Sequence, residues 1–365
     1  MAAVKTGLIG CGAISGNYLN HLRHFAIVDI AACADLNPEA AKSRGEEFGI
    51  PKVCSVDDLL ADGDIELVLN LTIPRAHAPV NLAALEHGKH AYCEKPFAVN
   101  REEATTVIEA ARSRKLRVGG APDTVFGPGI QTCRRLIDEG AIGIPTAATA
   151  FCCGRGHEHW HASPAFYYDV GAGPLFDMGV YYLTALVVLL GPVGSVLARH
   201  KATFSQRTAS SEGAAGLVID VKVPTHLAGI LEFRSGVIAT TTFSFDTMGG
   251  ANLPRIEIYG TEGTLSVPDP NGFDGPVSLK RIEDSEWQPQ AHTHKYISGR
   301  GLGLADFAHA IRENRHPRAD APLPFHVLDI MQAFHESGDA GNAVDLDSTC
   351  ERPEPMPEVL PQLVL

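Results

Sequence analysis

The first third of the chain alternates short apolar runs with stretches of helical periodicity. The apolar runs span 4–10, 27–34, 65–71, 90–93 and 116–119. Helical patterns lie between them, at 16–24, after Pro38, at 78–86 and at 101–113. Strands that alternate with helices at this spacing predict a parallel, doubly wound α/β sheet.

The pattern changes after Pro122. A helix is predicted at 127–140 and an alternating strand at 144–153. Six further strands without intervening helices are predicted at 196–204, 216–223, 228–233, 237–245, 255–259 and 263–267, with closing helices at 302–314 and 325–336. Consecutive strands of this kind indicate a meandering, mainly antiparallel sheet in an α+β domain.

These patterns, with a length of 365 residues, predict two domains and a tail. The expected boundaries are 1–122 for the first domain, 123–345 for the second and 346–365 for a proline-rich tail that lies extended on the surface. The hydrophobic content of 45% is enough for a sizeable core in each domain.

The net charge of the chain limits the kinds of molecule that it is expected to bind. The formal net charge of -13 argues against nucleic acid or an anionic membrane surface, because phosphate binding requires a basic footprint. A small ligand that is neutral or held by a few local cations is expected instead.

The sequence also favours a cytoplasmic location. Its start lacks the basic and apolar regions of a secretory signal, and its longest apolar run, 180–190, is interrupted by Tyr181, Tyr182 and Thr184. The eight cysteines form no CxxC pair and no metal-like spacing. We therefore expect reduced, mostly buried thiols.

A glycine turn follows the first apolar run. The segment Gly10-Cys11-Gly12-Ala13-Ile14-Ser15 leads from a strand into a helix, which is the context of a dinucleotide-binding fingerprint. Gly10 allows the tight turn, and Gly12 lets the backbone approach a pyrophosphate at the helix N-terminus. Serine occupies the third glycine position. Such turns also occur without a ligand, so the motif alone leaves that alternative open.

Asp35 ends the second apolar run. It stands close to the roughly 20-residue offset at which an acidic side chain meets the adenosine ribose diol. A carboxylate accepts from two hydroxyls but repels a 2′-phosphate, and no Arg or Lys adjoins it in sequence. Asp35 therefore favours NAD over NADP, the alternative being that it only caps the next helix.

The segment His90-Ala91-Tyr92-Cys93-Glu94-Lys95-Pro96 runs from a buried strand into an acid, a base and a proline. Ligands of open α/β sheets bind outside the carboxyl ends of the strands, where Asp35, Thr72 and Lys95 are all expected. Lys95 is the first candidate for chemistry. A solvated loop turn is the alternative.

These residues together resemble the glucose-fructose oxidoreductase/inositol dehydrogenase/MocA (Gfo/Idh/MocA) family of NAD(P)-dependent oxidoreductases. The resemblance rests on the GCGAIS turn, the segment from Thr72 to His77 and the segment 88–96. It implies a Rossmann domain, then a domain with a large open sheet that forms dimers or tetramers. It also implies that Lys95 reaches the nicotinamide ribose and the substrate. The implied NAD contacts are Gly10, Gly12, Ala13, Ile14, Asp35, Thr72, Pro74, His77, Glu94, Lys95 and Pro96.

A glycine-rich entry at 171–179 leads into a helix that carries Asp177 and Tyr181 at i and i+4, which puts them on one helical face. The family's catalytic helix usually has the pattern Asp-x-Gly-x-His-x-x-Asp. Tyr181 stands at the histidine position and Thr184 at the last aspartate position. Members that resemble glucose-fructose oxidoreductase or dihydrodiol dehydrogenase also have tyrosine there.

The implied chemistry moves a hydride from a carbinol carbon to NAD while a side chain takes the alcohol proton. A free phenol is a poor base at neutral pH, but a neighbouring ammonium such as that of Lys95 favours the phenolate. Asp177 would orient the substrate hydroxyl or balance the charge of Lys95. In the alternative, Tyr181 and Tyr182 only pack the helix and Asp177 caps it. Which tyrosine acts as the acid or base stays open.

Two aromatic and histidine-rich segments are further substrate candidates. In 156–161 the histidines alternate, so an extended segment would point all three the same way. We predict no metal site there, and Trp160 could offer an apolar face to a sugar ring. The alternative for this segment is a structural or surface role, and for the second segment, 166–169, it is core packing. The weaker substrate candidates are Asp123, Thr124, His159, Trp160, His161, Tyr167 and Tyr168.

The leading hypothesis is an NAD-dependent dehydrogenase acting on a secondary alcohol of a sugar, polyol or glycoside. One alternative is a glycosidase of the same family that keeps NAD bound and oxidises its substrate transiently. Another is an NAD-binding regulator without catalytic activity, which the missing histidine alone supports.

Overall fold

The computed structural model describes residues 1–360 as two compact units. Unit 1 contains 1–131 and 293–328 with the described part of 353–365, and unit 2 contains 132–292 and 329–352. The units are therefore discontinuous in sequence, because chain from the last third returns to unit 1. The boundaries expected at 122 and 345 treated each domain as one continuous stretch.

Unit 1 is built on a six-stranded sheet with the order β3-β2-β1-β4-β5-β6. Its strands are β1 (Val4–Ile9), β2 (Val28–Ala34), β3 (Lys52–Val53), β4 (Leu67–Asn70), β5 (His90–Cys93) and β6 (Val118–Gly120). Every pairing between them is parallel. The predicted doubly wound sheet is confirmed.

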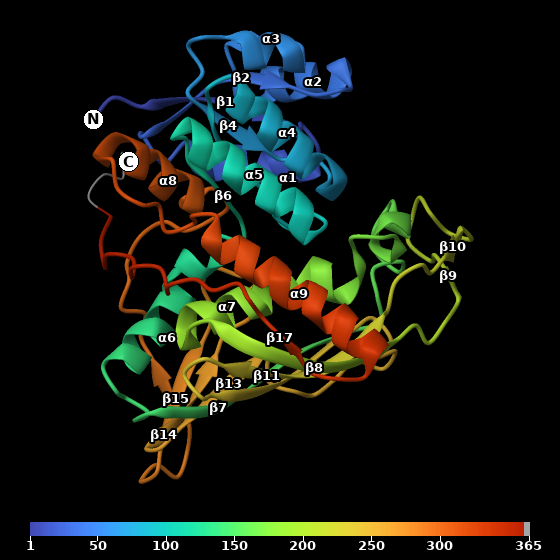
Figure 1. The fold of residues 1–365 in the computed structure, drawn as a ribbon, viewed down its shortest axis with the longest axis vertical. Coiled ribbons are helices and arrows are strands. Elements are labelled where there is room, and N and C mark those ends of the chain that lie inside the picture. The colour runs from blue at the N-terminus through green and yellow to red at the C-terminus, as the bar shows by residue number, and fades with distance from the viewer. Residues whose placement is uncertain (361–365) are drawn as a thin grey trace. The chain divides into compact units, whose positions relative to one another are not determined.

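The helices of unit 1 cover both faces of this sheet. Its helices are α1 (Ala13–Leu22), α2 (Pro38–Phe48), α3 (Val56–Ala61), α4 (Pro74–Glu86), α5 (Arg101–Arg114) and α8 (Leu302–Glu313), with the short turn η1 (Thr124–Phe126). Right-handed crossovers to the two sides of β1 place helices on opposite faces, and α4 packs beside α5 whereas α1 packs against α8 (Figure 1). This is why β4 is buried on both faces.

Two helix starts show how local chemistry sets the boundaries. The side chain of Asn37 caps α2 by accepting from the Glu39 amide, and Asn100 caps α5 by accepting from the Glu103 amide. Helix α4 begins at Pro74, four residues before the predicted start, because a proline at the first helical position sacrifices no hydrogen bond.

Unit 2 is built on a nine-stranded sheet with the order β16-β15-β14-β13-β7-β12-β11-β8-β17. Its strands are β7 (Pro145–Cys153), β8 (Val193–Lys201), β11 (His226–Phe233), β12 (Ile238–Ser244), β13 (Ile256–Gly260), β14 (Gly263–Val267), β15 (Val277–Arg281), β16 (Gln288–Gln290) and β17 (Val344–Asp345). Only β7 and β12 pair in parallel among these described strands. The predicted, mainly antiparallel sheet is confirmed.

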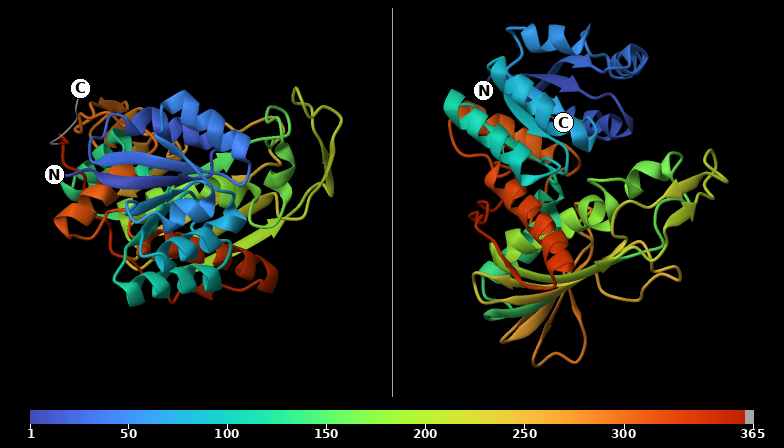
Figure 2. Two further views of the ribbon diagram at one scale, coloured as in Figure 1. Left: turned by 90° about the horizontal axis from the view of Figure 1, so that it is seen from above. Right: turned by 45° about the vertical axis from the view of Figure 1, so that its right-hand side comes forward.

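Helices cover one face of the nine-stranded sheet (Figure 2). They are α7 (Val180–Leu190) and the second half of α9 (Pro322–Ala340). The π-helical turn η3 (Leu175–Gly179) precedes α7. Helix α6 (Pro128–Asp138) begins in unit 1 and continues into unit 2. The Phe334 ring of α9 meets Phe243 of β12 edge to face and lies so close to Gly229 that a Cβ there would be 2.5 Å away. Every residue of α7 is buried.

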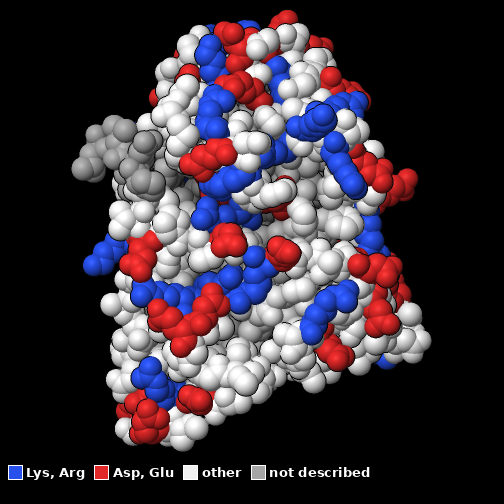
Figure 3. Space-filling view, turned by 60° about the vertical axis from the view of Figure 1, so that its left-hand side comes forward, with Lys and Arg blue, Asp and Glu red and all other residues white. Residues whose placement is uncertain are grey.

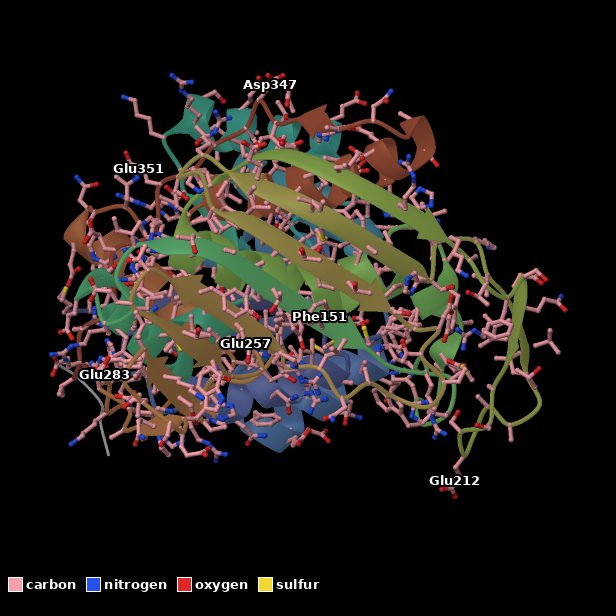
Figure 4. All side chains as sticks on the ribbon, turned by 90° about the horizontal axis from the view of Figure 1, so that it is seen from below. Phe151, Glu212, Glu257, Glu283, Asp347 and Glu351 are labelled. Carbon is pink, nitrogen blue, oxygen red and sulfur yellow. The ribbon has the colours of Figure 1, made fainter. Side chains whose placement is uncertain are left out.

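Within residues 1–360, no helix covers the opposite face of the same sheet (Figure 4). Phe151 of β7 and Glu257 of β13 are among its side chains, and both are partly exposed. The burial pattern of β11 alternates accordingly, with Leu227 and Leu231 buried and Ile230 and Glu232 exposed. One face of the sheet is therefore core and the other is open to solvent in this chain.

Two further segments complete unit 2 and the tail. The strands β9 (Gln206–Thr208) and β10 (Val218–Asp220) form a small separate sheet next to the turn η2 (Pro164–Tyr168). From 346 to 360 the tail forms no helix or strand, and it is not confined to the surface, because Cys350 and Met356 are 7% and 5% exposed. The expected tail also includes 361–365, which lie outside the described residues.

Acidic and basic residues are mixed on the surface (Figure 3), and the cysteines form no disulfide. On the face drawn in Figure 3, Lys and Arg are interspersed with Asp and Glu. All eight cysteines are free thiols, and those buried are Cys11, Cys33, Cys93, Cys133 and Cys350. None of the helices in residues 1–360 is long and apolar enough to cross a membrane.

Candidate functional site

The glycine turn after β1 has one crowded and one open position. Gly10 has φ +100°, and a Cβ there would lie 2.6 Å from the backbone of Leu71, so this position requires glycine. Gly12 differs, because a Cβ there would meet no atom within 4 Å among the described residues beyond its own chain neighbours and helix. The open space above Gly12 is where a bound group can approach the backbone.

The start of α1 fits an anionic group. Gly12 and Ala13 are exposed, and no side chain caps the helix, whose first turn holds no acidic residue. Its N-terminal amides therefore face solvent with their partial positive charge. Ser15 is buried, and its hydroxyl donates to the carbonyl of Gly12 at 2.7 Å, which explains how serine serves at the third glycine position. This turn fits the pyrophosphate of a dinucleotide.

Asp35 lies directly beside this turn. Its carboxylate accepts from the backbone amide of Cys11 at 2.8 Å and from that of Asn37 at 2.8 Å. Asn37 itself caps α2, so Asp35 is not the cap of that helix. The carboxylate thus joins the ends of β1 and β2, at the place where an adenosine ribose would be held.

A cation also lies at the glycine turn, which the sequence did not indicate. The guanidinium of Arg44 in α2 donates to the carbonyl of Gly12 at 3.3 Å and forms an ion pair of 2.6 Å with Glu47. Nine residues separate Arg44 from Asp35, so only the packing of α2 brings it here.

His77 connects two loops at the carboxyl edge of the sheet. Its ring is buried, with Nδ1 2.7 Å from the carbonyl oxygen of Pro96 and Nε2 3.0 Å from that of Thr72. Burial lowers the pKa of His77, so the neutral ring donates to one of these carbonyls at a time. Thr72 donates its hydroxyl to Asn70 at 2.6 Å. His77 therefore holds the loop that follows Lys95.

The Glu94 side chain holds the backbone at Lys95. One carboxylate oxygen accepts from the hydroxyl of Tyr18 at 2.9 Å, and the other accepts from the backbone amide of Lys95 at 2.8 Å. The Tyr18 pKa is raised by burial and by the charge of Glu94, so its hydroxyl stays a donor. Lys95 is the second residue after β5 and is partly exposed.

Asp123 and Thr124 are fully buried. The carboxylate of Asp123 accepts from the amides of Gly301 and Gly303 at 2.7 and 3.2 Å, and burial raises its pKa. These contacts fasten the loop after β6 to the start of α8. These contacts give Asp123 a structural role, and the expected substrate contacts of Asp123 and Thr124 stay predictions.

In unit 2, the glycine-rich segment leads into the π-helical turn that carries Asp177, and Tyr181 follows in the first turn of α7. Such π-helical turns are frequent at functional sites. Tyr182 is fully buried with its ring edge against Phe243, and burial raises its pKa strongly, which disfavours a phenolate. Thr184 donates its hydroxyl to the carbonyl of Val180 within the helix.

The carboxylate of Asp177 is paired with His157, a residue that was not among the candidates. Nε2 of His157 lies 2.7 Å from Oδ2 of Asp177. The alternating histidines in 156–161 were the only sequence signal for it, and they pointed equally to His159 and His161. Twenty residues separate the two partners, so no local pattern could have paired them.

The histidine-rich segment is a turn, so the prediction that an extended segment points all three histidines one way is wrong. The amides of Trp160 and His161 both bond to the carbonyl of His157. His157 and His161 consequently share a cluster of rings around Tyr167, with centroid distances of 4.3 and 5.1 Å. Trp160 joins this cluster and is 57% exposed, whereas His159 is half-buried.

Tyr168 lies outside that exposed cluster and is buried. Its hydroxyl bonds to Glu158, which also pairs with Arg207 at 2.8 Å, and Arg207 in turn pairs with Asp246. Arg207 and both carboxylates are almost fully buried, so these ion pairs are well shielded from water. The structure favours a structural role for Tyr168 over substrate binding. The network fixes the segment that carries His157.

Among residues 1–360, no group of three or more histidine, cysteine or acidic side chains could hold a metal ion. The polar groups described above thus point to a nucleotide site in unit 1 and to a paired carboxylate in unit 2.

Comparison with known proteins agrees with both units. Residues 4–120 match the model of an oxidoreductase family with an NAD-binding Rossmann fold, and residues 130–266 match the Gfo/Idh/MocA C-terminal domain. The chain is 28% identical to 1,5-anhydro-D-fructose reductase of Ensifer adhaerens, over 94% of this chain and 99% of that one.

Two other relatives extend the comparison. The chain is 26% identical to D-xylose 1-dehydrogenase (NADP(+)) 2 of Haloferax volcanii, over 87% of this chain and 92% of that one. Its fold is similar to the apo form of levoglucosan dehydrogenase, with a TM-score of 0.82 and 23% identity over 96% of this chain and all of the other. The protein therefore has an NAD-binding Rossmann domain and belongs to the Gfo/Idh/MocA family of oxidoreductases.

Proposed function

We propose that the protein is an NAD-dependent dehydrogenase that moves a hydride between a secondary alcohol of a sugar, polyol or glycoside and the nicotinamide. The observation that carries this proposal is the position of Lys95, two residues after the end of β5, at the carboxyl edge of an NAD-binding sheet. The names of the relatives, a xylose dehydrogenase and an anhydrofructose reductase, support a carbohydrate substrate.

The proposed roles divide between the two units. When bound, NAD supplies the hydride acceptor, and Gly12, Ala13 and Asp35 would hold its pyrophosphate and adenosine ribose. Tyr181 takes the alcohol proton and Lys95 favours its phenolate, while Asp177 orients the substrate hydroxyl. Of the two adjacent tyrosines, Tyr181 is the better candidate because it follows Asp177 at i+4 on one helical face, whereas the ring of Tyr182 packs edge to face on Phe243.

A substrate screen tests the reaction. Polyols, aldoses and glycosides are offered with NAD or NADP, and the absorbance of the reduced cofactor is followed. Reduction of NAD by a member of these classes is expected. Release of an aglycone from a glycoside without net NADH would instead indicate the glycosidase reaction, and no turnover despite NAD binding would indicate a regulator.

Replacing Asp35 by asparagine is expected to lower the preference for NAD over NADP by about tenfold or more. The amide keeps one oxygen, which can accept from the backbone amide of either Cys11 or Asn37, and it removes the charge that repels a 2′-phosphate. The ratio of kcat/KM for the two cofactors measures this, with Glu39→Gln on the exposed start of α2 as control. An unchanged ratio in a folded variant would rule out this role for Asp35.

We further propose that the open face of the nine-stranded sheet binds a second copy of the chain, as the family resemblance implies. The large apolar side chains Leu197, Ile230 and Ile238 are 41%, 44% and 52% exposed on strands of this sheet. Leu197 and Ile230 are directly opposed in the pairing of β8 and β11. Exposed apolar groups gathered in this way are typical of an interface between protein chains.

Light scattering combined with size exclusion tests this assembly. The unaltered protein is expected to form a dimer or tetramer, and Ile230→Lys is expected to shift the mass toward that of a monomer, because it buries a charge in the interface. Ile282→Lys, in an exposed turn of the same unit, serves as control and should leave the mass unchanged. A monomeric unaltered protein would overturn the proposal.

A further inference from the structure

The Asp177 carboxylate receives an imidazole from a different segment of unit 2. Asp177 lies in η3, whereas His157 lies in the turn after β7, and the Nε2 to Oδ2 distance is 2.7 Å. The side chains of His157 and Asp177 are 17% and 15% exposed, so the pair is shielded but still reachable from solvent.

A third side chain determines which nitrogen of His157 carries the proton. The indole Nε1 of Trp160 lies 3.3 Å from Nδ1 of His157. An indole N–H is only a donor, so Nδ1 must accept and Nε2 must carry the hydrogen. Nε2–H therefore donates to Asp177. The neutral imidazole acts as a fixed donor toward the carboxylate.

The position of this imidazole is strongly constrained. Its ring contacts those of Tyr167 and Phe245 at centroid distances of 4.3 and 4.8 Å. The next residue, Glu158, is held in the buried ion pair with Arg207. The preceding residue, Gly156, has φ +92°, and a Cβ there would collide with the Tyr168 hydroxyl and Glu158. Both chain neighbours of His157 are thus anchored.

We propose that His157 is a positioning residue for Asp177, with Trp160 selecting its tautomer. The Nε2–H bond holds one carboxylate oxygen of Asp177 in a single orientation. A carboxylate accepts up to about four hydrogen bonds, so a held one still accepts from a substrate hydroxyl. This inference rests on the proposed function, in which Asp177 orients the substrate. In this inference, the imidazole of His157 in the turn after β7 orients the carboxylate of Asp177 in η3.

The tautomer is measured directly, without any substrate. In protein labelled with ¹⁵N-histidine at pH 8, we expect His157 as the Nε2–H tautomer, with Nδ1 as the acceptor. Trp160→Phe is expected to remove this selection, so that the Nδ1 resonance shifts. Observing the Nδ1–H tautomer or an imidazolium at this pH would overturn the inference, whether or not the proposed reaction is correct.

Kinetics then separate a positioning role from a purely structural one. His157→Phe keeps an aromatic ring but removes the donor, and it is expected to lower kcat by about 10- to 100-fold with little change in the KM for NAD. His157→Gln restores an N–H near the Nε2 position and should recover kcat to within about fivefold. His200→Gln is the control, since His200 forms another imidazole–carboxylate pair of the same unit, with Asp339.

A double-variant cycle tests whether His157 acts through Asp177. In the Asp177→Asn background, His157→Phe is expected to change kcat by less than about twofold. An equally large loss in both backgrounds, or no recovery with glutamine in a folded variant, would overturn the inference. If the unaltered protein oxidises no substrate at all, the proposed function fails, and the tautomer measurement still decides the His157 assignment.

Discussion

Replacing Lys95 by alanine is expected to lower kcat on the best substrate by about 100- to 10,000-fold, the range over which a general acid or base contributes. The ammonium is the group proposed to favour the Tyr181 phenolate and to bind near the nicotinamide ribose. The fold should persist, because the Glu94 carboxylate bonds to the backbone amide of Lys95 and not through the removed side chain. Steady-state turnover with NAD measures the loss.

Lys42→Ala provides the matched control for this variant. Lys42 is an exposed lysine on α2 in the same unit, so its removal changes the net charge equally and should leave turnover unchanged. A folded Lys95→Ala protein with kcat within about threefold of the unaltered enzyme would contradict the proposed mechanism.

Gly12→Ala is expected to weaken NADH binding by at least about tenfold, roughly 1.4 kcal/mol, while the melting temperature changes by less than about 2 °C. The added methyl group meets no protein atom within 4 Å, so the folded chain tolerates it. It occupies the space into which the pyrophosphate must come. Fluorescence titration with NADH and thermal unfolding measure the two quantities separately.

Variants at two other glycines serve as comparisons for this prediction. Gly10→Ala is expected to lower stability itself, since φ is +100° and its Cβ would lie 2.6 Å from the Leu71 backbone. Gly63→Ala, whose Cβ also has open space around it, should change neither stability nor binding. Unchanged NADH affinity in Gly12→Ala would show that the cofactor does not bind at this turn.

The larger part of the fold could be predicted because it depends on short-range patterns. Period-two and helical periodicity located most strands and helices, since each face of an element must be apolar where it meets the core. Short elements such as β3, β16 and β17, of two or three residues, were missed because they are too brief to show a period. The return of 293–328 to unit 1 left no local signal either.

The candidate site divides in the same way. Gly10, Gly12 and Asp35 could be recognised because a strand, a turn and a helix that are consecutive in sequence must hold them. Asp123 showed the opposite. Its place after a strand suggested a ligand contact, but its buried carboxylate accepts from the amides of Gly301 and Gly303, which come from a distant segment. Burial by a remote element cannot be inferred from the residue's own neighbours.

The sequence alone therefore determined the alternation of strands and helices, the nucleotide turn and the lysine after β5, because these follow from periodicity and from residues near one another in the chain. Only the tertiary structure decided that His157, and not the residue four positions after Asp177, supplies the imidazole that bonds to this carboxylate. The physical reason is that a side-chain hydrogen bond forms over a few ångströms between segments whose proximity depends on the packing of the whole unit.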